Sequence, residues 1–240
     1  MDTSQRHDHP DRHAHQHGQG PGHGSAQAGQ DTDPRQWLTQ EYWDDRYSGD
    51  ALWSGQPNPM LVHYAAGLAP GRVLDVGSGE GADAIWLATQ GWTVTGADIS
   101  PVVLERAASF AAEAGPDVAA RVSWQQADLL AWAPPESHFD LVSAQFVHLP
   151  RPERESLHRR LSAAVRPGGT LLVVSHHPLD LELGHRPQLP EMFATAEEMA
   201  TVLDPGAWDI ETSQPGREAT FPDGETLTVH DAVLRAVRRA

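Results

Sequence analysis

Short apolar segments recur along the middle of the chain, each followed by a segment whose apolar residues are three or four positions apart. The apolar segments cover residues 72–76, 93–97, 122–126, 139–144 and 170–174. The last of them is apolar at every position after Thr170, as expected of a parallel strand that is buried on both faces. The pattern predicts five parallel strands alternating with helices.

The segments between the strands have the period of amphipathic helices. Leucine or valine recurs at every fourth position from 157 to 165, in a helix expected to end at residues 166–169. Another helix is expected to begin with Ser100 as its N-cap and Pro101 in its first turn. A capping box at residues 195–198 predicts the start of a further helix.

Two more strands are predicted near the C-terminus, at residues 208–212 and 226–234, joined through the turn at residues 222–224. Because strand–helix–strand connections are right-handed, the repeated units form one open sheet with helices on both faces. We therefore expect an α/β fold with a Rossmann-like, seven-stranded, mainly parallel sheet and a C-terminal antiparallel hairpin. Ligands of such sheets bind beyond the carboxyl ends of the strands, where the strand order reverses.

The first residues of the chain differ from the rest in composition. Residues 1–34 are rich in histidine, glutamine and glycine and nearly free of large apolar side chains, which predicts a disordered tail before a domain at residues 35–240. Two interpretations of this tail stay open: a purely solubilising segment, which we favour, and loose metal binding, since closely spaced imidazoles can chelate a metal ion. The histidines concerned are His7, His9, His13, His15, His17 and His23.

Charge and composition exclude several kinds of partner. The net charge is −16 and no basic footprint is visible, which argues against a nucleic-acid partner. The absence of cysteine excludes disulfides, thiolate catalysis and cysteine-ligated zinc, and we expect no metal site in the domain. No apolar run reaches 18 residues and no signal-peptide core is visible, so we expect no membrane partner and a cytoplasmic protein.

A glycine-rich turn follows the first predicted strand and precedes a helix. Such a turn lets the backbone approach a nucleotide closely, and the helix behind it offers N–H groups. Gly77, Gly79 and Ala82 also fit the dinucleotide fingerprint, with Asp98 about twenty residues later as a ribose-binding acid. Asp75, two residues before the first glycine, suits a cationic amino-acid group better than a pyrophosphate.

Taken as an ordered set, the motifs resemble those of the class I S-adenosylmethionine-dependent methyltransferases across residues 41–238. They are the run Val73 to Gly81, the acid Asp98, and the segments at 127–129, 139–142 and 166–169. The resemblance implies a methyltransferase with S-adenosyl-L-methionine as its cofactor and a small molecule as its methyl acceptor. A looser similarity, to the tellurite-resistance and thiopurine methyltransferase group, rests on Trp43, Tyr47 and the C-terminal segment.

The resemblance also implies a role for each motif residue. The glycine turn would pass beneath the methionine and ribose parts, Asp75 would lie near the amino group, and Asp98 would hold the ribose hydroxyls. The cofactor-binding residues expected on this basis are Asp75, Gly77, Ser78, Gly79, Gly81, Asp98, Ile99, Asp128, Leu129 and Gln145. For Asp98 and Asp128 the alternative is helix capping or turn chemistry, and for Ile99 and Trp124, which could flank adenine, it is simple core packing.

Three histidines follow the fourth and fifth predicted strands at the expected ligand edge. His148, His176 and His177 are the candidate catalytic bases, needed only if the acceptor must lose a proton. The leading hypothesis is a methyltransferase that works by in-line displacement. The alternatives are an S-adenosylmethionine-binding or metal-handling protein without turnover, and a nicotinamide oxidoreductase, which only the glycine turn supports.

Overall fold

The computed structural model describes residues 34–52, 54–186, 188–221 and 223–240. The predicted tail therefore lies, except for Pro34, outside the described residues, as do its histidines. Within the described residues, no helix has both the length and the apolar character needed to cross a bilayer.

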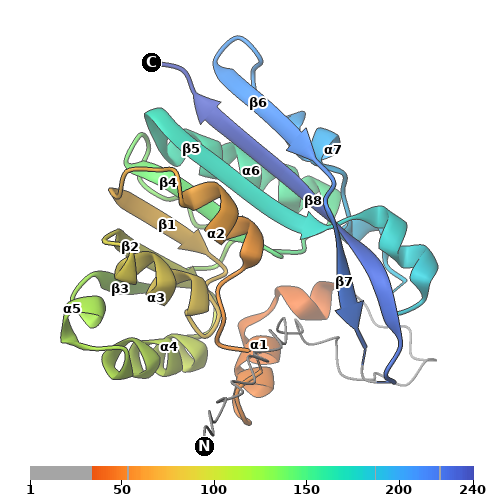
Figure 1. The fold of residues 1–240 in the computed structure, drawn as a ribbon, viewed down its shortest axis with the longest axis horizontal. Helices are drawn as coiled ribbons and strands as arrows, with labels where there is room; N and C mark the ends of the chain where they lie inside the picture. Colours follow the sequence, from red (N-terminus) through yellow and green to blue (C-terminus); the bar gives the residue numbers. More distant parts are fainter. Residues whose placement is uncertain (1–33, 53, 187, 222) are drawn as a thin grey trace, which may run out of the picture.

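One mixed sheet organises the described residues (Figure 1). Five parallel strands form one side: β1 (Arg72–Val76), β2 (Thr93–Asp98), β3 (Val122–Gln126), β4 (Phe139–Gln145) and β5 (Val165–His176). Three antiparallel strands extend it: β6 (Trp208–Ser213), β7 (Gly216–Thr220) and β8 (Thr226–Arg238). The order is β3-β2-β1-β4-β5-β8-β6, with β7 paired to β8, so the strand order reverses between β1 and β4.

Helices cover both faces of the sheet. The α-helices are α1 (Gln40–Tyr47), α2 (Pro59–Ala65), α3 (Ala82–Thr89), α4 (Pro101–Glu113), α5 (Pro116–Ala119), α6 (Arg151–Ala164) and α7 (Ala196–Ala200). Short 3₁₀ turns are η1 (Pro34–Leu38), η2 (Pro178–Leu183) and η3 (Pro190–Met192). The predicted Rossmann-like α/β fold is confirmed.

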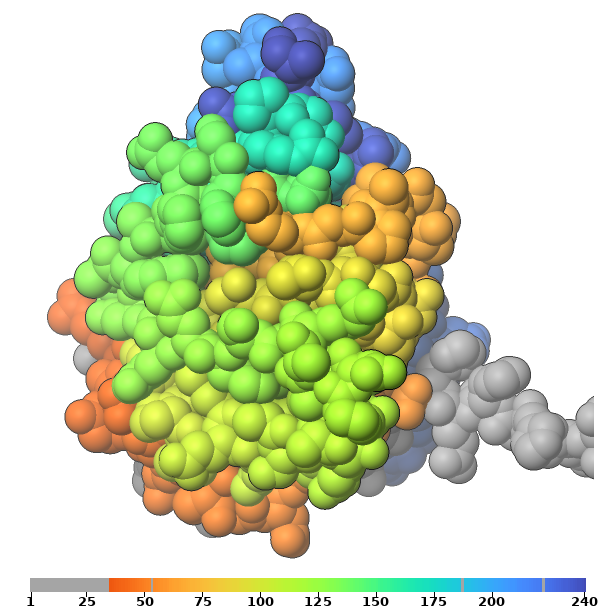
Figure 2. Space-filling view, turned by 90° about the vertical axis from the view of Figure 1, so that its left-hand side faces the viewer, coloured from red at the N-terminus to blue at the C-terminus, as the bar shows by residue number. Residues whose placement is uncertain are grey.

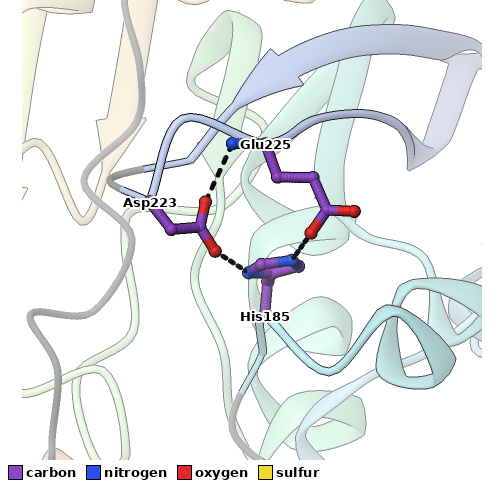
Figure 3. A group of neighbouring side chains, drawn as sticks. All are labelled: His185, Asp223 and Glu225. Atoms are coloured by element: carbon purple, nitrogen blue, oxygen red, sulfur yellow. Dashed lines mark hydrogen bonds and ion pairs between the residues drawn. The ribbon is translucent and has the colours of Figure 1, made fainter.

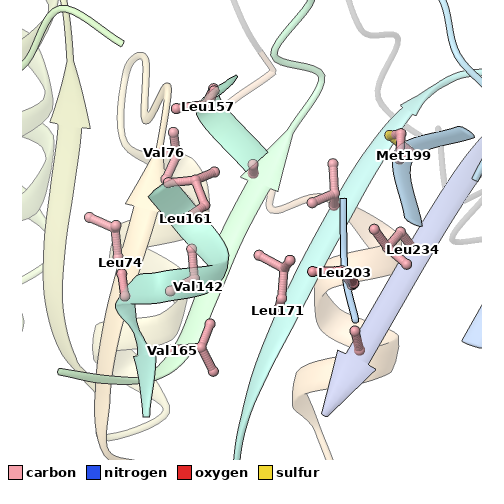
Figure 4. Packing of buried hydrophobic residues seen from close by; sticks show 14 of the residues in the cluster. Leu74, Val76, Val142, Leu157, Leu161, Val165, Leu171, Met199, Leu203 and Leu234 are labelled. Carbon is pink, nitrogen blue, oxygen red and sulfur yellow. The ribbon is translucent and has the colours of Figure 1, made fainter. Parts of the chain in front are cut away.

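Two apolar clusters, one on each face, bind the helices to the sheet. On one face Leu157 and Leu161 of α6 lie over Leu74 and Val76 of β1, and Met199 of α7 lies beside Leu234 of β8 (Figure 4). On the other face the residues of α2 and α3 pack on β1 and β2. Burying these side chains is the main force that holds the strands' carboxyl ends in fixed positions.

The predicted C-terminal antiparallel hairpin is confirmed, but its first strand is β7, which the sequence analysis missed, rather than β6. β6 pairs with another part of β8, also antiparallel, and the sheet of the described residues has eight strands. The first part of β8 pairs with β7, and the remainder, from Asp231, lies between β5 and β6. β7 alternates between exposed and half-buried positions and contains no large apolar residue, so it has no hydrophobic signature.

The boundary between α6 and β5 also differs from the prediction. The helix ends at Ala164 and β5 begins at Val165, so residues 166–169, expected to be a helix end, lie in the strand.

Two predicted helix starts are confirmed. Ser100 caps α4 by accepting from Val103 N–H, and Thr195 and Glu198 form the reciprocal capping box of α7.

Candidate functional site

The glycine-rich turn leaves β1 at the point where the strand order reverses. Gly77, Gly79 and Gly81 all have positive φ, a conformation that residues with a Cβ rarely adopt. The backbone N–H groups of Gly77 and Ser78 both donate to the carbonyl oxygen of Ala97 in β2, at 2.8 and 3.0 Å. The turn is therefore fixed to the neighbouring strand before α3 begins.

A tryptophan explains why two of the nearby positions are glycine. A Cβ on Gly81 or on Gly96 would lie 2.6 Å from the ring of Trp124, closer than the non-bonded approach of a Cβ atom to another heavy atom in real proteins. Trp124 therefore packs beneath the turn. This contact supports core packing as the role of Trp124, in place of a position beside the adenine. On the other side, a Cβ on Gly77 would lie 2.8 Å from Val147, which follows β4.

Asp98, the last residue of β2, holds the turn through its carboxylate. Its Oδ2 accepts from Gly79 N–H at 2.9 Å and its Oδ1 accepts from Ser100 N–H at 3.0 Å. Burial raises the pKa of Asp98, and the backbone N–H donors of Ser100, Gly79 and Ile99 offset part of that rise. Asp98 thus has the turn-capping role, and it lies beside the glycine turn, where the ribose role was expected.

Three buried oxygen atoms at this edge of the sheet have no hydrogen-bond partner among the described residues. They are Oδ2 of Asp75, Oγ of Ser78 and Oε1 of Gln145. Asp75 is only 2% exposed, and Gln145 is the last residue of the adjacent strand β4, its amide donating to Ser143 Oγ at 2.9 Å. Buried acceptors without donors are costly, which indicates that a ligand supplies the donors. An ammonium group, with three N–H bonds and a positive charge, fits this set.

The first helix lies against the same edge. Ser100 Oγ donates to Asp44 of α1 at 2.5 Å, and Arg106 of α4 pairs with Glu80 of the glycine turn at 2.7 Å. The same guanidinium donates to the carbonyl oxygens of Tyr47, Gly49 and Asp50. Figure 2 shows this N-terminal segment, in orange, lying beside the yellow-green surface of α4. The sequence analysis missed Arg106 because its partners are distant along the chain.

The residues expected at the adenine follow two neighbouring strands, Ile99 after β2 and Asp128 and Leu129 after β3. Oδ1 of Asp128 accepts from Leu130 N–H at 2.9 Å, which is turn chemistry, and its side chain is exposed. The carbonyl oxygen of Leu129 accepts from Arg160 of α6 at 2.7 Å. Ile99 is half-buried at the end of β2, and its carbonyl oxygen accepts from Gln126 at 3.2 Å. These contacts place Ile99, Asp128 and Leu129 at neighbouring strand ends.

His148 and His176 meet in a cluster of rings beyond β4 and β5. The ring centroids of His148 and His176 are 5.0 Å apart, Phe146 lies 4.4 Å from His176, and Phe193 lies 5.8 Å from His148. We call these four residues the ring cluster. Phe146 has φ of +56°, strained for a bulky side chain, and such strain is typical of functional sites. The sequence analysis missed Phe146 and Phe193.

His177, the third candidate base, has a structural contact. Its Nδ1 accepts from Leu179 N–H at 3.2 Å and so caps the 3₁₀ turn η2. Burial lowers the pKa of His177, and the neighbouring Asp180 offsets part of that shift. Because Nδ1 accepts this hydrogen bond, the proton of the neutral ring is on Nε2. The Nδ1 atom of His177 is then not available to accept a proton from a substrate. We therefore carry His148 and His176 forward as the candidate bases.

A histidine between two carboxylates lies at the tip of the β7–β8 hairpin (Figure 3). Nε2 of His185 is 3.0 Å from Glu225, and Nδ1 faces Asp223 at 4.0 Å from the other side of the ring. The His185 ring also stacks on Phe221, at 4.0 Å between centroids. The two carboxylates face different nitrogens of the ring, and one ligand atom from each of the three side chains lies within 4.8 Å of the other two. The arrangement attaches the hairpin to the segment after η2.

Comparison with known proteins bears directly on this site. Residues 73–169 match the family model described as a methyltransferase domain. The chain is 29% identical over 181 residues to the 2-heptyl-1-hydroxyquinolin-4(1H)-one methyltransferase of Mycobacteroides abscessus, which covers 69% of this chain and 78% of that protein. It is 35% identical over 135 residues to the 27-O-demethylrifamycin SV methyltransferase of Amycolatopsis mediterranei, 54% of this chain and 47% of that one.

The fold has solved counterparts. A structure solved for the conversion of a disulfide bond into a thioacetal group during echinomycin biosynthesis matches with a TM-score of 0.66 and 25% identity. The match covers 83% of this chain and 91% of that one. The matched domain contains the glycine turn, Asp98 and Gln145, the residues that surround the unpartnered oxygens. The fold, the matched domain and the relatives together support the assignment of the chain as an S-adenosylmethionine-dependent methyltransferase.

Proposed function

We propose that the chain methylates a hydroxyl group of a small organic molecule. The observation that carries the proposal is the adjacency of two groups at one sheet edge: the unpartnered oxygens of Asp75, Ser78 and Gln145, and the ring cluster. The first group suits the cationic end of the cofactor. The second suits an apolar acceptor beside a proton-accepting imidazole.

The cofactor would be held by residues from four strand ends. Gly77, Ser78, Gly79 and Gly81 would support it from below, with Asp75 and Gln145 accepting from its ammonium group. Asp98 would accept from the ribose hydroxyls through lone pairs that its backbone donors leave free. Ile99, Asp128 and Leu129 would border the adenine.

The cofactor supplies an electrophilic methyl group on a positively charged sulfur atom. A hydroxyl oxygen must give up its proton as it is methylated, and a neutral imidazole can accept that proton. We assign this role to His148, with His176 stacked against it. Phe146 and Phe193 would hold the acceptor and exclude water, and positioning of this kind supplies much of the rate in a displacement reaction.

The hydroxyl assignment draws on two relatives whose names specify a hydroxyquinolone and an O-demethylated rifamycin.

A second candidate for the methyl acceptor is a soft, already nucleophilic atom, as in the tellurite-resistance and thiopurine methyltransferase group. Trp43 and Tyr47, on which that similarity rests, stack on each other in α1 at 5.8 Å. Such an acceptor reacts as an anion that has already lost its proton to the solvent, so the two candidates differ in their need for His148.

A turnover assay tests the proposal. The purified chain, given S-adenosylmethionine and a panel of hydroxyquinolones, phenols, alcohols and thiols, should add one methyl group to a hydroxylated member. Mass spectrometry would detect the methylated product together with S-adenosylhomocysteine. Methylation of thiols alone would favour the second candidate. Cofactor binding with no turnover on any member would favour a protein that binds the cofactor without catalysis.

A further inference from the structure

Asp83 lies directly after the glycine turn, in the first turn of α3, and no motif assigns it a role. Its Oδ1 accepts from Asn58 N–H at 2.6 Å. Asn58 in turn caps α2 by accepting from Met60 N–H at 2.8 Å. Asp83 is therefore held in place by the segment that leads into α2. A solvated acid at a helix N-terminus would have no such contact.

Asp83 has an acidic neighbour, Asp75. The carboxyl of Asp75 accepts from the backbone N–H of Ala84, the residue after Asp83, and its Oδ2 is buried without a partner. The charged groups that face Asp75 are Asp83 from α3 and Asp98 from β2, both acidic. In the described part of the chain, no arginine or histidine is hydrogen-bonded to or ion-paired with Asp75 or Asp83.

The nearby charges do not neutralise the pair. Arg106 is paired with Glu80 and with three carbonyl oxygens of residues 47–50. On the far side of Asp98 the facing group is Asp44 of α1, another acid. The glycine turn is thus bordered by buried carboxyls and lacks a compensating positive charge among these neighbours.

Such a pair cannot hold two negative charges at low cost. Burial raises the pKa of Asp75 well above its usual range, and the charges of Asp83 and Asp98 raise it further. Burial also raises the pKa of Asp83 to about 6, although the hydrogen bond from Asn58 N–H lowers that pKa. The pair therefore retains a proton near neutral pH.

We propose that Asp75 and Asp83 together form the receptor for the cationic end of S-adenosylmethionine, and that the cofactor binds by displacing a proton that the two carboxyls share. This inference rests on the proposed function. One positive charge enters and one proton leaves to the solvent, so the charge of the site is conserved. The unpartnered Oδ2 of Asp75 accepts from the incoming cation, and Asp83 supplies the second negative charge.

Calorimetry with S-adenosylhomocysteine, which retains the ammonium group, tests the exchange. Titrations at neutral pH in two buffers of different ionisation enthalpy should show release of about one proton per ligand. The affinity should rise with pH by up to about tenfold per pH unit for as long as the free pair retains its proton, and level off only above the pH at which the pair loses it. Asp83→Asn should abolish most of the proton release and weaken binding at pH 8 by about tenfold.

The stability of the same variant provides a second readout. Because the pKa of Asp83 is higher in the fold than in the unfolded chain, the folded state loses stability as pH rises through about 6. Asp83→Asn removes this loss and should raise the melting temperature above pH 6, and its side-chain oxygen can still accept from Asn58. Asp117→Asn, an exposed change on α5, is the matched control and should alter neither binding nor melting.

Each result has a definite consequence. Binding of S-adenosylhomocysteine with no proton release and no pH dependence would overturn the proton exchange and leave the proposed function intact. Wild-type proton release by Asp83→Asn would remove Asp83 from the receptor. No binding in any buffer would overturn the proposed function itself.

Discussion

His148→Ala is expected to lower kcat on a hydroxylated acceptor by about 10²–10⁴-fold, the range for loss of a general base. His148 follows β4 directly and stacks against His176 at the edge that carries the unpartnered oxygens. The cofactor sites on β1 and β2 do not involve this side chain, so the affinity for S-adenosylhomocysteine should stay unchanged. Steady-state kinetics and calorimetry on the same preparation separate the two effects.

The pH profile identifies what His148 does. If it accepts the acceptor's proton, kcat/KM of the wild type should fall as the imidazole becomes protonated at acidic pH, and the variant should lose that limb. His63→Ala, an exposed change on α2, is the control and should keep wild-type kinetics. Wild-type kcat in His148→Ala would place His148 among the packing residues and make His176 the base. A raised KM with unchanged kcat would indicate an acceptor that needs no base.

Asp98→Ala is expected to weaken cofactor binding by about 1.5–3 kcal/mol, which is roughly 10- to 150-fold in Kd. The carboxylate loses its contacts with the ribose, and the glycine turn loses the acceptor for Gly79 N–H. Because that N–H is left buried, the free energy of unfolding should also fall by about 1–3 kcal/mol. Calorimetry gives the first quantity and denaturant unfolding gives the second.

Asp98→Asn separates the two roles of this side chain. The amide oxygen can accept from Gly79 N–H, but the NH₂ group then faces the N–H of Ser100, so the variant should keep only part of the stability, and it offers one acceptor fewer to the ribose diol. We expect its affinity to lie between those of the wild type and Asp98→Ala. Unchanged affinity in the alanine variant would show that the ribose is held elsewhere and that Asp98 serves only the turn.

Local signals along the chain predicted most of the fold. The apolar strands β1 to β5 and the caps at Ser100 and Thr195 depend on residues close in sequence, and the structure has them. β7 was missed because its short, charged sequence carries no hydrophobic period, and its pairing with β8 decides its conformation. The start of β5 was missed because a proline and two glycines resemble a turn, and the pairing of Val165 with Phe139 of β4, where the strand begins, is a long-range contact.

The site was predicted where motifs are contiguous and missed where contacts are long-range. The glycine turn, Asp75 and Asp98 fall at one edge of the sheet, as the motif order indicated, and the comparisons decide for a methyltransferase over a nicotinamide enzyme. Arg106 and Phe193 reach the site only through the tertiary fold. Asp83 resembles an ordinary acid at a helix N-terminus, and only its buried contacts single it out.

Calorimetric titration with S-adenosylhomocysteine tests the central claim most directly. We predict a Kd in the micromolar range at neutral pH and a higher melting temperature in the presence of the ligand. At a hundredfold excess of free ligand over Kd, binding to the folded state alone adds about 2.7 kcal/mol to the free energy of unfolding. A folded protein that binds neither S-adenosylhomocysteine nor S-adenosylmethionine would contradict the account.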